Sequence, residues 1–134
     1  MTEADVREAE VREAVARLVS AFGDGRLEDY FGSFHPDCSF IFHTTEQRLG
    51  SVEEYRDLWR RWVHEDGLEV LGCRTGNTSV QLWGEVAVVT HDVDTRVRTN
   101  DGEEDLSERE TIVLARQADG RWLAVHEHLS PRTS

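Results

Sequence analysis

Lysine is missing from the 134-residue sequence, and all 15 of its basic residues are arginine. This absence excludes catalysis through a lysine Schiff base and a phosphate-binding loop of the lysine-containing type. Cysteine is scarce: Cys38 and Cys73 are the only two, and their spacing fits no metal-binding motif. We expect both to be reduced thiols in or near the core.

Long apolar runs are missing as well. No segment approaches the roughly 20 apolar residues that a membrane helix needs, and residues 1–10 lack the apolar stretch of a secretion signal. Basic residues are outnumbered, since the net charge is -12, and such a surface repels phosphate backbones and anionic membranes. The sequence therefore predicts a cytoplasmic protein that binds neither nucleic acid nor membranes.

What is present is typical of a folded globular protein, with 38% hydrophobic and 31% charged residues. The length suits a single hydrophobic core, and no repeat, linker or low-complexity stretch divides the chain. We therefore predict one domain over residues 1–134, with a loose polar tail at residues 130–134.

Three segments have the apolar spacing of helices. Gly23 and Gly25 end the first, whose apolar stripe consists of Val11, Ala14, Val15, Leu18, Val19 and Phe22. The second runs from Arg26 and includes Tyr30 and Phe34. Pro36 is expected to end it, because the residue before a proline disfavours the helical conformation.

The third predicted helix has the clearest start. Ser51 and Glu54 form the pattern of a capping box, in which each side chain accepts a hydrogen bond from the other residue's backbone amide. Its apolar stripe consists of Tyr55, Leu58, Trp59 and Trp62, and Gly67 marks its end.

The other segments read as strands. Residues 38–43 are rich in aromatic and β-branched types, and Arg48 and Leu49 are expected to form a short return strand. Four longer strands are predicted at residues 68–83, 86–98, 107–117 and 121–129, separated by glycine-containing turns. Segregated helices followed by a strand meander favour the α+β class, with the helices packed on one face of a bent sheet.

Several motifs resemble the SnoaL-like family of the nuclear transport factor 2-like superfamily. They are His35-Pro36-Asp37 before a strand that ends Phe42-His43-Thr44, Leu49-Gly50-Ser51 before a helix with Leu58-Trp59, and Asp119-Gly120-Arg121-Trp122 leading to His126-Glu127-His128-Leu129-Ser130. The last is also similar to the end of the association domain of calcium/calmodulin-dependent protein kinase. The resemblance implies a cone-shaped, cystatin-like α+β roll, in which helices back a curved mixed or antiparallel sheet around a pocket, and it implies a homodimer.

Strand alternation selects candidate catalytic residues. His91 shares the more apolar face of residues 86–98 with Ala87, Val89 and Val93, so we expect it to face the helices. The face of the last strand stays open, because Glu127 and the pair His126 and His128 alternate along it. If Glu127 points inward, it can form an acid–base couple with His91, and burial would raise the pKa of its carboxyl toward neutrality.

Other residues are candidates for binding a ligand. Ketosteroid isomerases of this fold have a catalytic aspartate where this sequence has Phe42, with His43 beside it, so that mechanism does not carry over. Trp59 and Trp62 are expected to line the pocket together with Phe42. Arg109 can clamp a carboxylate, although an ion pair with neighbouring acids accounts for it equally.

Inward-facing His126 and His128 would supply a polar patch in the pocket. Two imidazoles on one side of a strand also suit a metal ion, but no spacing secures a third ligand, so we predict neither a metal nor another cofactor.

Two functions remain open on the sequence alone. The first is binding of a hydrophobic or carboxylate-bearing small molecule in an apolar pocket, in its enzymatic form an isomerase- or cyclase-type reaction by acid–base chemistry. The second is a non-catalytic, homodimerising association module. The sequence does not decide whether the protein is an enzyme, because the family includes both kinds.

Overall fold

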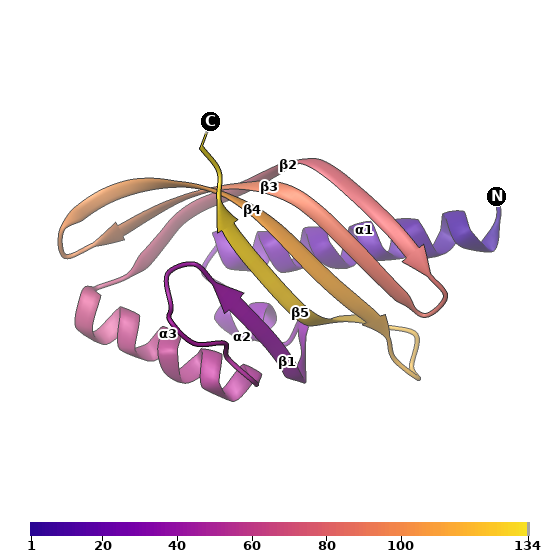
Figure 1. Cartoon of the computed structure of the whole chain (residues 1–134), viewed down its shortest axis with the longest axis horizontal. Helices are drawn as coiled ribbons and strands as arrows, with labels where there is room; N and C mark the ends of the chain where they lie inside the picture. The colour runs from indigo at the N-terminus through magenta and orange to yellow at the C-terminus, as the bar shows by residue number, and fades with distance from the viewer. Residues whose placement is uncertain (134) are drawn as a thin grey trace.

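Helices cover one face of a curved five-stranded sheet in the computed structural model, which describes residues 1–133 (Figure 1). The elements in chain order are α1 (Glu3–Gly23), α2 (Leu27–Phe31), β1 (Phe34–Phe42), α3 (Val52–Asp66), β2 (Glu69–Trp83), β3 (Val86–Thr99), β4 (Gly102–Arg116) and β5 (Trp122–Pro131). The strand order is β1-β5-β4-β3-β2, with β1 parallel to β5 and the other pairs antiparallel. The predicted α+β fold is confirmed.

Local signals set the ends of α3. The Ser51 hydroxyl accepts a hydrogen bond from the Glu54 amide at 3.1 Å, as the capping box predicts. The Glu54 carboxylate, however, accepts a hydrogen bond from the amide of Gly50 at 2.7 Å rather than from the amide of Ser51. Gly67 ends the helix in the left-handed conformation, with φ of 67°, which glycine adopts without steric cost.

The prediction for the second helix was wrong at its end. α2 stops at Phe31, and both Phe34 and Pro36 belong to β1. Proline is tolerated there because β1 is an edge strand, where a missing amide breaks no ladder on the open side. The expected return strand at Arg48 and Leu49 is reduced to one bridge between Leu49 and Phe40.

The last strands are longer than predicted. β4 starts at Gly102 rather than residue 107, and its pairing with β3 is continuous from the turn onward. β5 extends through Pro131, and the guanidinium of Arg132 contacts Asp94 at 2.9 Å. The tail that we expected to be loose from residue 130 is therefore held by the sheet through Arg132, and Ser134 lies outside the described residues.

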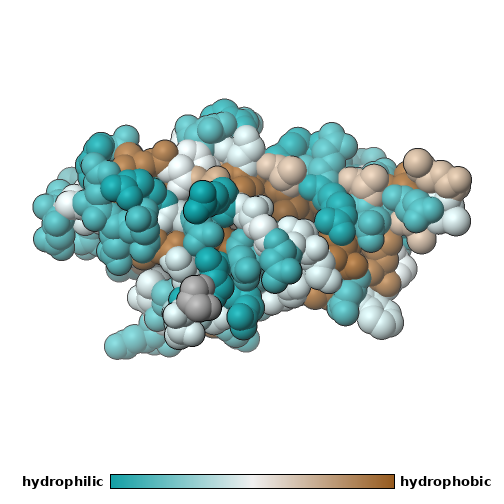
Figure 2. Space-filling view, turned by 90° about the horizontal axis from the view of Figure 1, so that it is seen from above, coloured by the Kyte–Doolittle hydropathy of each residue, from teal (hydrophilic) through white to brown (hydrophobic). Residues whose placement is uncertain are grey.

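The face of the sheet away from the helices is partly apolar. Figure 2, seen from above, shows apolar patches scattered among polar side chains. No helix among residues 1–133 is long and apolar enough to cross a membrane. The opposite face of the sheet packs on the helices and contains the candidate site.

Candidate functional site

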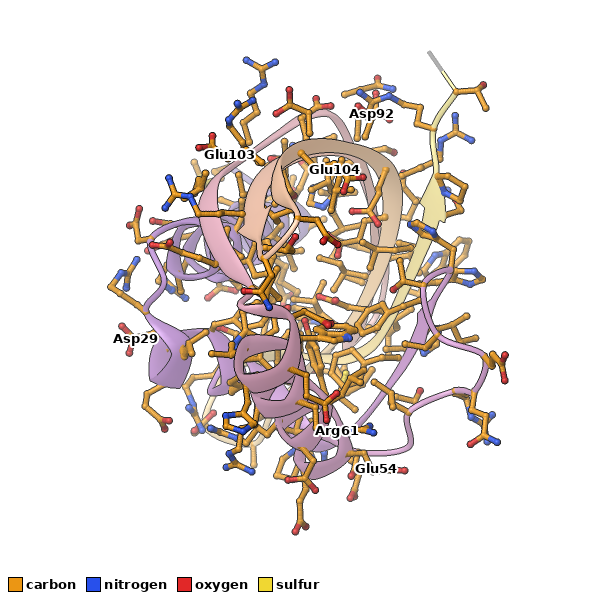
Figure 3. All side chains as sticks on the ribbon, turned by 90° about the vertical axis from the view of Figure 1, so that its left-hand side faces the viewer. Asp29, Glu54, Arg61, Asp92, Glu103 and Glu104 are labelled. Carbon is orange, nitrogen blue, oxygen red and sulfur yellow. The ribbon has the colours of Figure 1, made fainter. Side chains whose placement is uncertain are left out.

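A pocket with two connected chambers lies between the sheet and the helices. The outer chamber has a volume of about 350 Å³ and the inner chamber about 70 Å³. They share the lining residues Phe22, Phe42, Tyr55, Thr95, Glu108 and Leu129, so the inner chamber continues the outer one. The outer chamber opens between α3 and β4, and Figure 3 looks from this end, with Glu104 on the hairpin side across from α3.

Aromatic side chains wall the outer chamber. Tyr55, Trp59 and Trp62 come from α3, where their spacing places them on one helix face, and Phe42 comes from the end of β1. The rings of Trp59 and Trp62 lie 6.1 Å apart, with an interplanar angle of 65°. The structure thus brings the predicted residues Phe42, Trp59 and Trp62 together around one cavity.

Three carboxyl groups, those of Glu108, Glu110 and Glu127, line the inner chamber. Glu127 is only 1% exposed, and its Oε2 atom has no hydrogen-bond partner among the described residues. Burial raises the pKa of the Glu127 carboxyl well above its ordinary value of 4.5, and the negative charge of Glu110 and a hydrogen bond between the two side chains raise it further. Glu127 therefore keeps its proton to a higher pH than an exposed glutamate.

His91 faces the helices and is 2% exposed, but the structure contradicts its direct pairing with Glu127. Its Nε2 lies 2.6 Å from Oε1 of Glu110, to which we assign it as the donor. β4 lies between β3 and β5, so Glu110 separates the two predicted partners. His91 lines neither chamber and acts on the pocket through Glu110.

Sequence reasoning missed Glu110, although a signal for it exists. The β3–β4 hairpin turns at Asn100 and Asp101, with Thr99 opposite Gly102. Counting back from that turn places Glu110 directly opposite His91, which is the observed pairing. Recognition of the tight turn would therefore have identified the partner of His91.

A β-bulge at Val125 decides which side of β5 faces the pocket. Val113 of β4 pairs with His126, but its neighbour Leu114 pairs with Ala124, so Val125 is the extra residue. Such a bulge reverses the alternation of side chains that follow it. As a result, both Ala124 and Glu127 are buried on the helix side, three residues apart.

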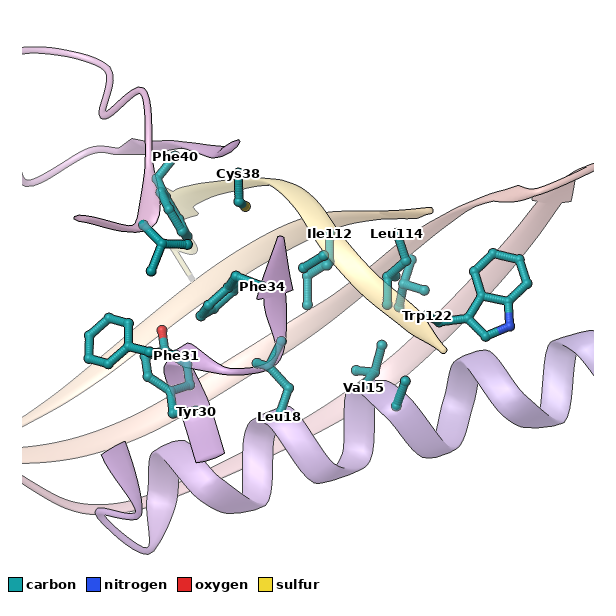
Figure 4. Packing of buried hydrophobic residues seen from close by; sticks show 14 of the residues in the cluster. Val15, Leu18, Tyr30, Phe31, Phe34, Cys38, Phe40, Ile112, Leu114 and Trp122 are labelled. Carbon is teal, nitrogen blue, oxygen red and sulfur yellow. The ribbon is translucent and has the colours of Figure 1, made fainter. Parts of the chain in front are cut away.

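The two tyrosines of the inner chamber bond to each other. The hydroxyls of Tyr30 and Tyr55 are 2.8 Å apart in a cluster with Phe31 and Phe34, and Figure 4 shows Tyr30 beside these two rings. Burial raises the pKa of both hydroxyls well above 10, with a further contribution from the charge of Glu127. Both stay protonated, and because one proton serves their mutual bond, the other is available to a ligand.

Cys73 also lines the inner chamber. Burial raises the pKa of its thiol to about 11, so it is present as a neutral thiol rather than as a nucleophilic thiolate. Both cysteines are free thiols, as expected.

The structure does not bring the other predicted residues into the pocket. Arg109 is exposed, and His126 and His128 lie after the bulge on the outer face with it. The Nδ1 atom of His126 lies 2.8 Å from the hydroxyl of Ser39. His43 stands at the pocket rim, where its Nε2 lies 2.6 Å from Oε2 of Glu108. Within residues 1–133, no three metal-ligating side chains form a group.

Comparisons with known proteins agree on the fold. Residues 11–134 match a family described as SnoaL-like domain. A nuclear transport factor 2-like superfamily protein from Salmonella enterica is similar with a TM-score of 0.80 and 16% identity, covering 98% of this chain and 94% of that one. No curated protein matches the chain.

Two further solved structures are similar to this chain and are described as different kinds of protein. A ketosteroid isomerase-like protein from Erwinia carotovora has a TM-score of 0.77 and 14% identity, covering 94% of this chain and 96% of that one. The CaMKII hub of S. rosetta has a TM-score of 0.72 and 18% identity, covering 92% and 95%. At such identities the likeness extends to the fold alone, so the chemistry rests on the pocket.

Proposed function

Because the chain belongs to the SnoaL-like domain family of the nuclear transport factor 2-like superfamily, we propose that it binds a hydrophobic small molecule and catalyses proton transfer on it. The observation that supports this proposal is Glu127, a buried carboxyl group with a free oxygen in an otherwise largely apolar cavity. A buried carboxyl oxygen without a hydrogen-bond partner costs stability, and perturbed carboxyl groups in pockets are characteristic of active sites.

The proposed reaction is an isomerisation or cyclisation. The Glu127 carboxylate takes a proton from a carbon beside a carbonyl group. In an isomerisation, the protonated form returns it to a second carbon. In a cyclisation, the carbanion attacks a second carbonyl carbon, and the proton goes to the oxygen of that carbonyl. The free hydroxyl proton of the Tyr30–Tyr55 pair donates to the carbonyl oxygen, where negative charge develops. The pair His91 and Glu110 positions Glu127. Such a reaction is redox-neutral and requires no cofactor.

The lining of the pocket favours a ligand without a carboxylate. Binding of a carboxylate rested on Arg109, which lies on the outer face of the sheet. Among the described residues that line the two chambers there is no arginine or histidine. The carboxyl groups of this lining would repel an anion, so our proposal keeps the hydrophobic ligand and omits the carboxylate.

The base-catalysed ring opening of 5-nitrobenzisoxazole tests the proposal, since it reports a carboxylate base in an apolar site as a coloured product. We expect the protein to accelerate it and the rate to rise with pH until Glu127 is ionised. Because Glu110, Tyr30 and Tyr55 face Glu127 and its pKa is raised, the midpoint should lie above 4.5. A rate equal to that in buffer between about pH 4 and about pH 9 would contradict the proposal.

Self-association is a second candidate function. Apolar side chains gather on the outer face of the central strands, namely Val86, Val88, Val113, Ala115, Leu123 and Val125. They do not overlap the pocket, so a homodimer through this face is compatible with ligand binding. Sedimentation equilibrium should give the mass of a dimer for the wild type and of a monomer for Val113→Arg, and a monomeric wild type would refute it.

A further inference from the structure

The charges around the pocket are of one sign. Its lining contains five acidic residues, namely Asp66, Glu104, Glu108, Glu110 and Glu127. No basic side chain of the described residues lines either chamber. The field inside the pocket is therefore set by carboxyl groups, in a protein with a net charge of -12.

Histidines outside the lining contact two of these acids. His43 lies 2.6 Å from Glu108, and His91 lies 2.6 Å from Glu110. Asp66 and Glu104, at the rim of the outer chamber, form no ion pair among residues 1–133. The open end of the pocket thus has two carboxylates that form no ion pair with the described residues.

Two of the five buried polar atoms without hydrogen-bond partners among the described residues belong to side chains that line the pocket. The Oε2 atom of Glu127 has no partner, and neither has the indole Nε1 of Trp59, a side chain that is 7% exposed and lines the outer chamber. Buried polar atoms without partners are rare in folded proteins. A ligand that spans both chambers would reach both residues.

The aromatic walls suit a positively charged group. Trp62 is half-buried and packs on the buried ring of Trp59, and Asp66 follows Trp62 by one helical turn on α3. The face of an indole ring attracts a cation through its quadrupole, and carboxylates nearby add to that attraction. A neutral apolar ligand would use the rings but leave the two rim carboxylates unused, and an anion would be repelled by them.

We propose that the ligand is an amphiphilic amine. Its protonated nitrogen lies at the rim, between the carboxylates of Asp66 and Glu104 and the indole rings of Trp59 and Trp62. Its uncharged part, with the carbonyl group that the proposed reaction requires, extends inward to Glu127. This inference rests on the proposed function, because it assigns a chemical class to the ligand of that same pocket.

Three probes of similar shape and different charge test the inference. They are 2-(1-naphthyl)ethylamine, 2-(1-naphthyl)ethanol and the anion of 1-naphthaleneacetic acid (the acetate), each titrated by calorimetry near neutral pH. We expect the amine to bind about tenfold more tightly than the alcohol, and the acetate most weakly. In the double variant Asp66→Asn/Glu104→Gln, the advantage of the amine should fall to about twofold while the alcohol binds as before.

The double variant Glu10→Gln/Glu53→Gln is the matched control, because it removes the same charge from exposed positions outside the pocket lining. It should preserve the advantage of the amine. Equal binding of amine and alcohol, or tightest binding of the acetate, would overturn the assignment of an amine as the ligand. The proposed function would not be affected. If the variant Asp66→Asn/Glu104→Gln keeps the full advantage of the amine, the protonated nitrogen does not lie between these two carboxylates. Failure of all three probes to bind would overturn both proposals.

Discussion

Deletion of Val125 is expected to keep Glu127 facing the pocket, because Val125 is the extra residue of the bulge in β5. Without it, the pairs Leu114–Ala124 and Val113–His126 would follow each other in a regular antiparallel register. Glu127 would stay on the helix side and His126 on the outer face. The pairing of β5 with β1 is also interrupted at this point and must adjust, so we expect a cost of about 1 to 3 kcal/mol of unfolding free energy. The denaturant midpoint and slope measure the loss.

The substitution Val125→Ala is the matched control for this deletion. It keeps the chain length and the bulge, and it removes only two methyl groups from a half-buried side chain, so it should cost about 1 kcal/mol. If the deletion instead exposes Glu127, so that its carboxyl titrates together with the exposed glutamates, the assignment of the inward face of β5 is wrong.

The substitution Glu127→Gln is expected to lower the rate of 5-nitrobenzisoxazole ring opening by about 10² to 10⁴, the usual contribution of a positioned general base. Glutamine has the shape of the protonated acid and can still donate a hydrogen bond to Glu110, so the fold should be retained. Only the ability to take a proton is removed. The rate per active protein, measured at a pH above the wild-type midpoint, tests this expectation.

Glu10→Gln, on the exposed side of α1, is the control for that experiment because it changes the charge equally and lies outside the pocket lining. It should leave the rate unchanged. A Glu127→Gln variant that keeps its rate within about threefold of the wild type would show that another group is the base, since loss of a general base costs at least about 10².

The elements with strong periodic patterns could be predicted from the sequence. α1 and α3 followed from their apolar stripes and end signals, since the residues that define them are close in the chain. The first part of β4 was missed because Glu103, Glu104 and Asp105 make it polar on both faces. It is a strand through its backbone pairing with β3 and through cross-strand ion pairs such as Arg96 with Asp105, at 2.9 Å.

The sequence predicted only part of the pocket lining, for a related reason. Alternation placed His91 inside, because β3 has no bulge on the side of β4. It could not place Glu127, because the bulge at Val125 has no marker in the sequence. The bonded hydroxyls of Tyr30 and Tyr55 lie 25 residues apart on different helices, and only packing of the two helices against the sheet brings them together.

The most direct test of the account is the pH titration of the Glu127 carboxyl itself, followed by carbon-13 NMR and assigned with the Glu127→Gln variant. The account predicts that this resonance titrates well above the ordinary value of 4.5, separately from the exposed glutamates, because burial and the charge of Glu110 favour the protonated form. A midpoint together with the exposed glutamates would contradict it, since Glu127 would then be a solvated carboxylate and not a buried acid poised for proton transfer.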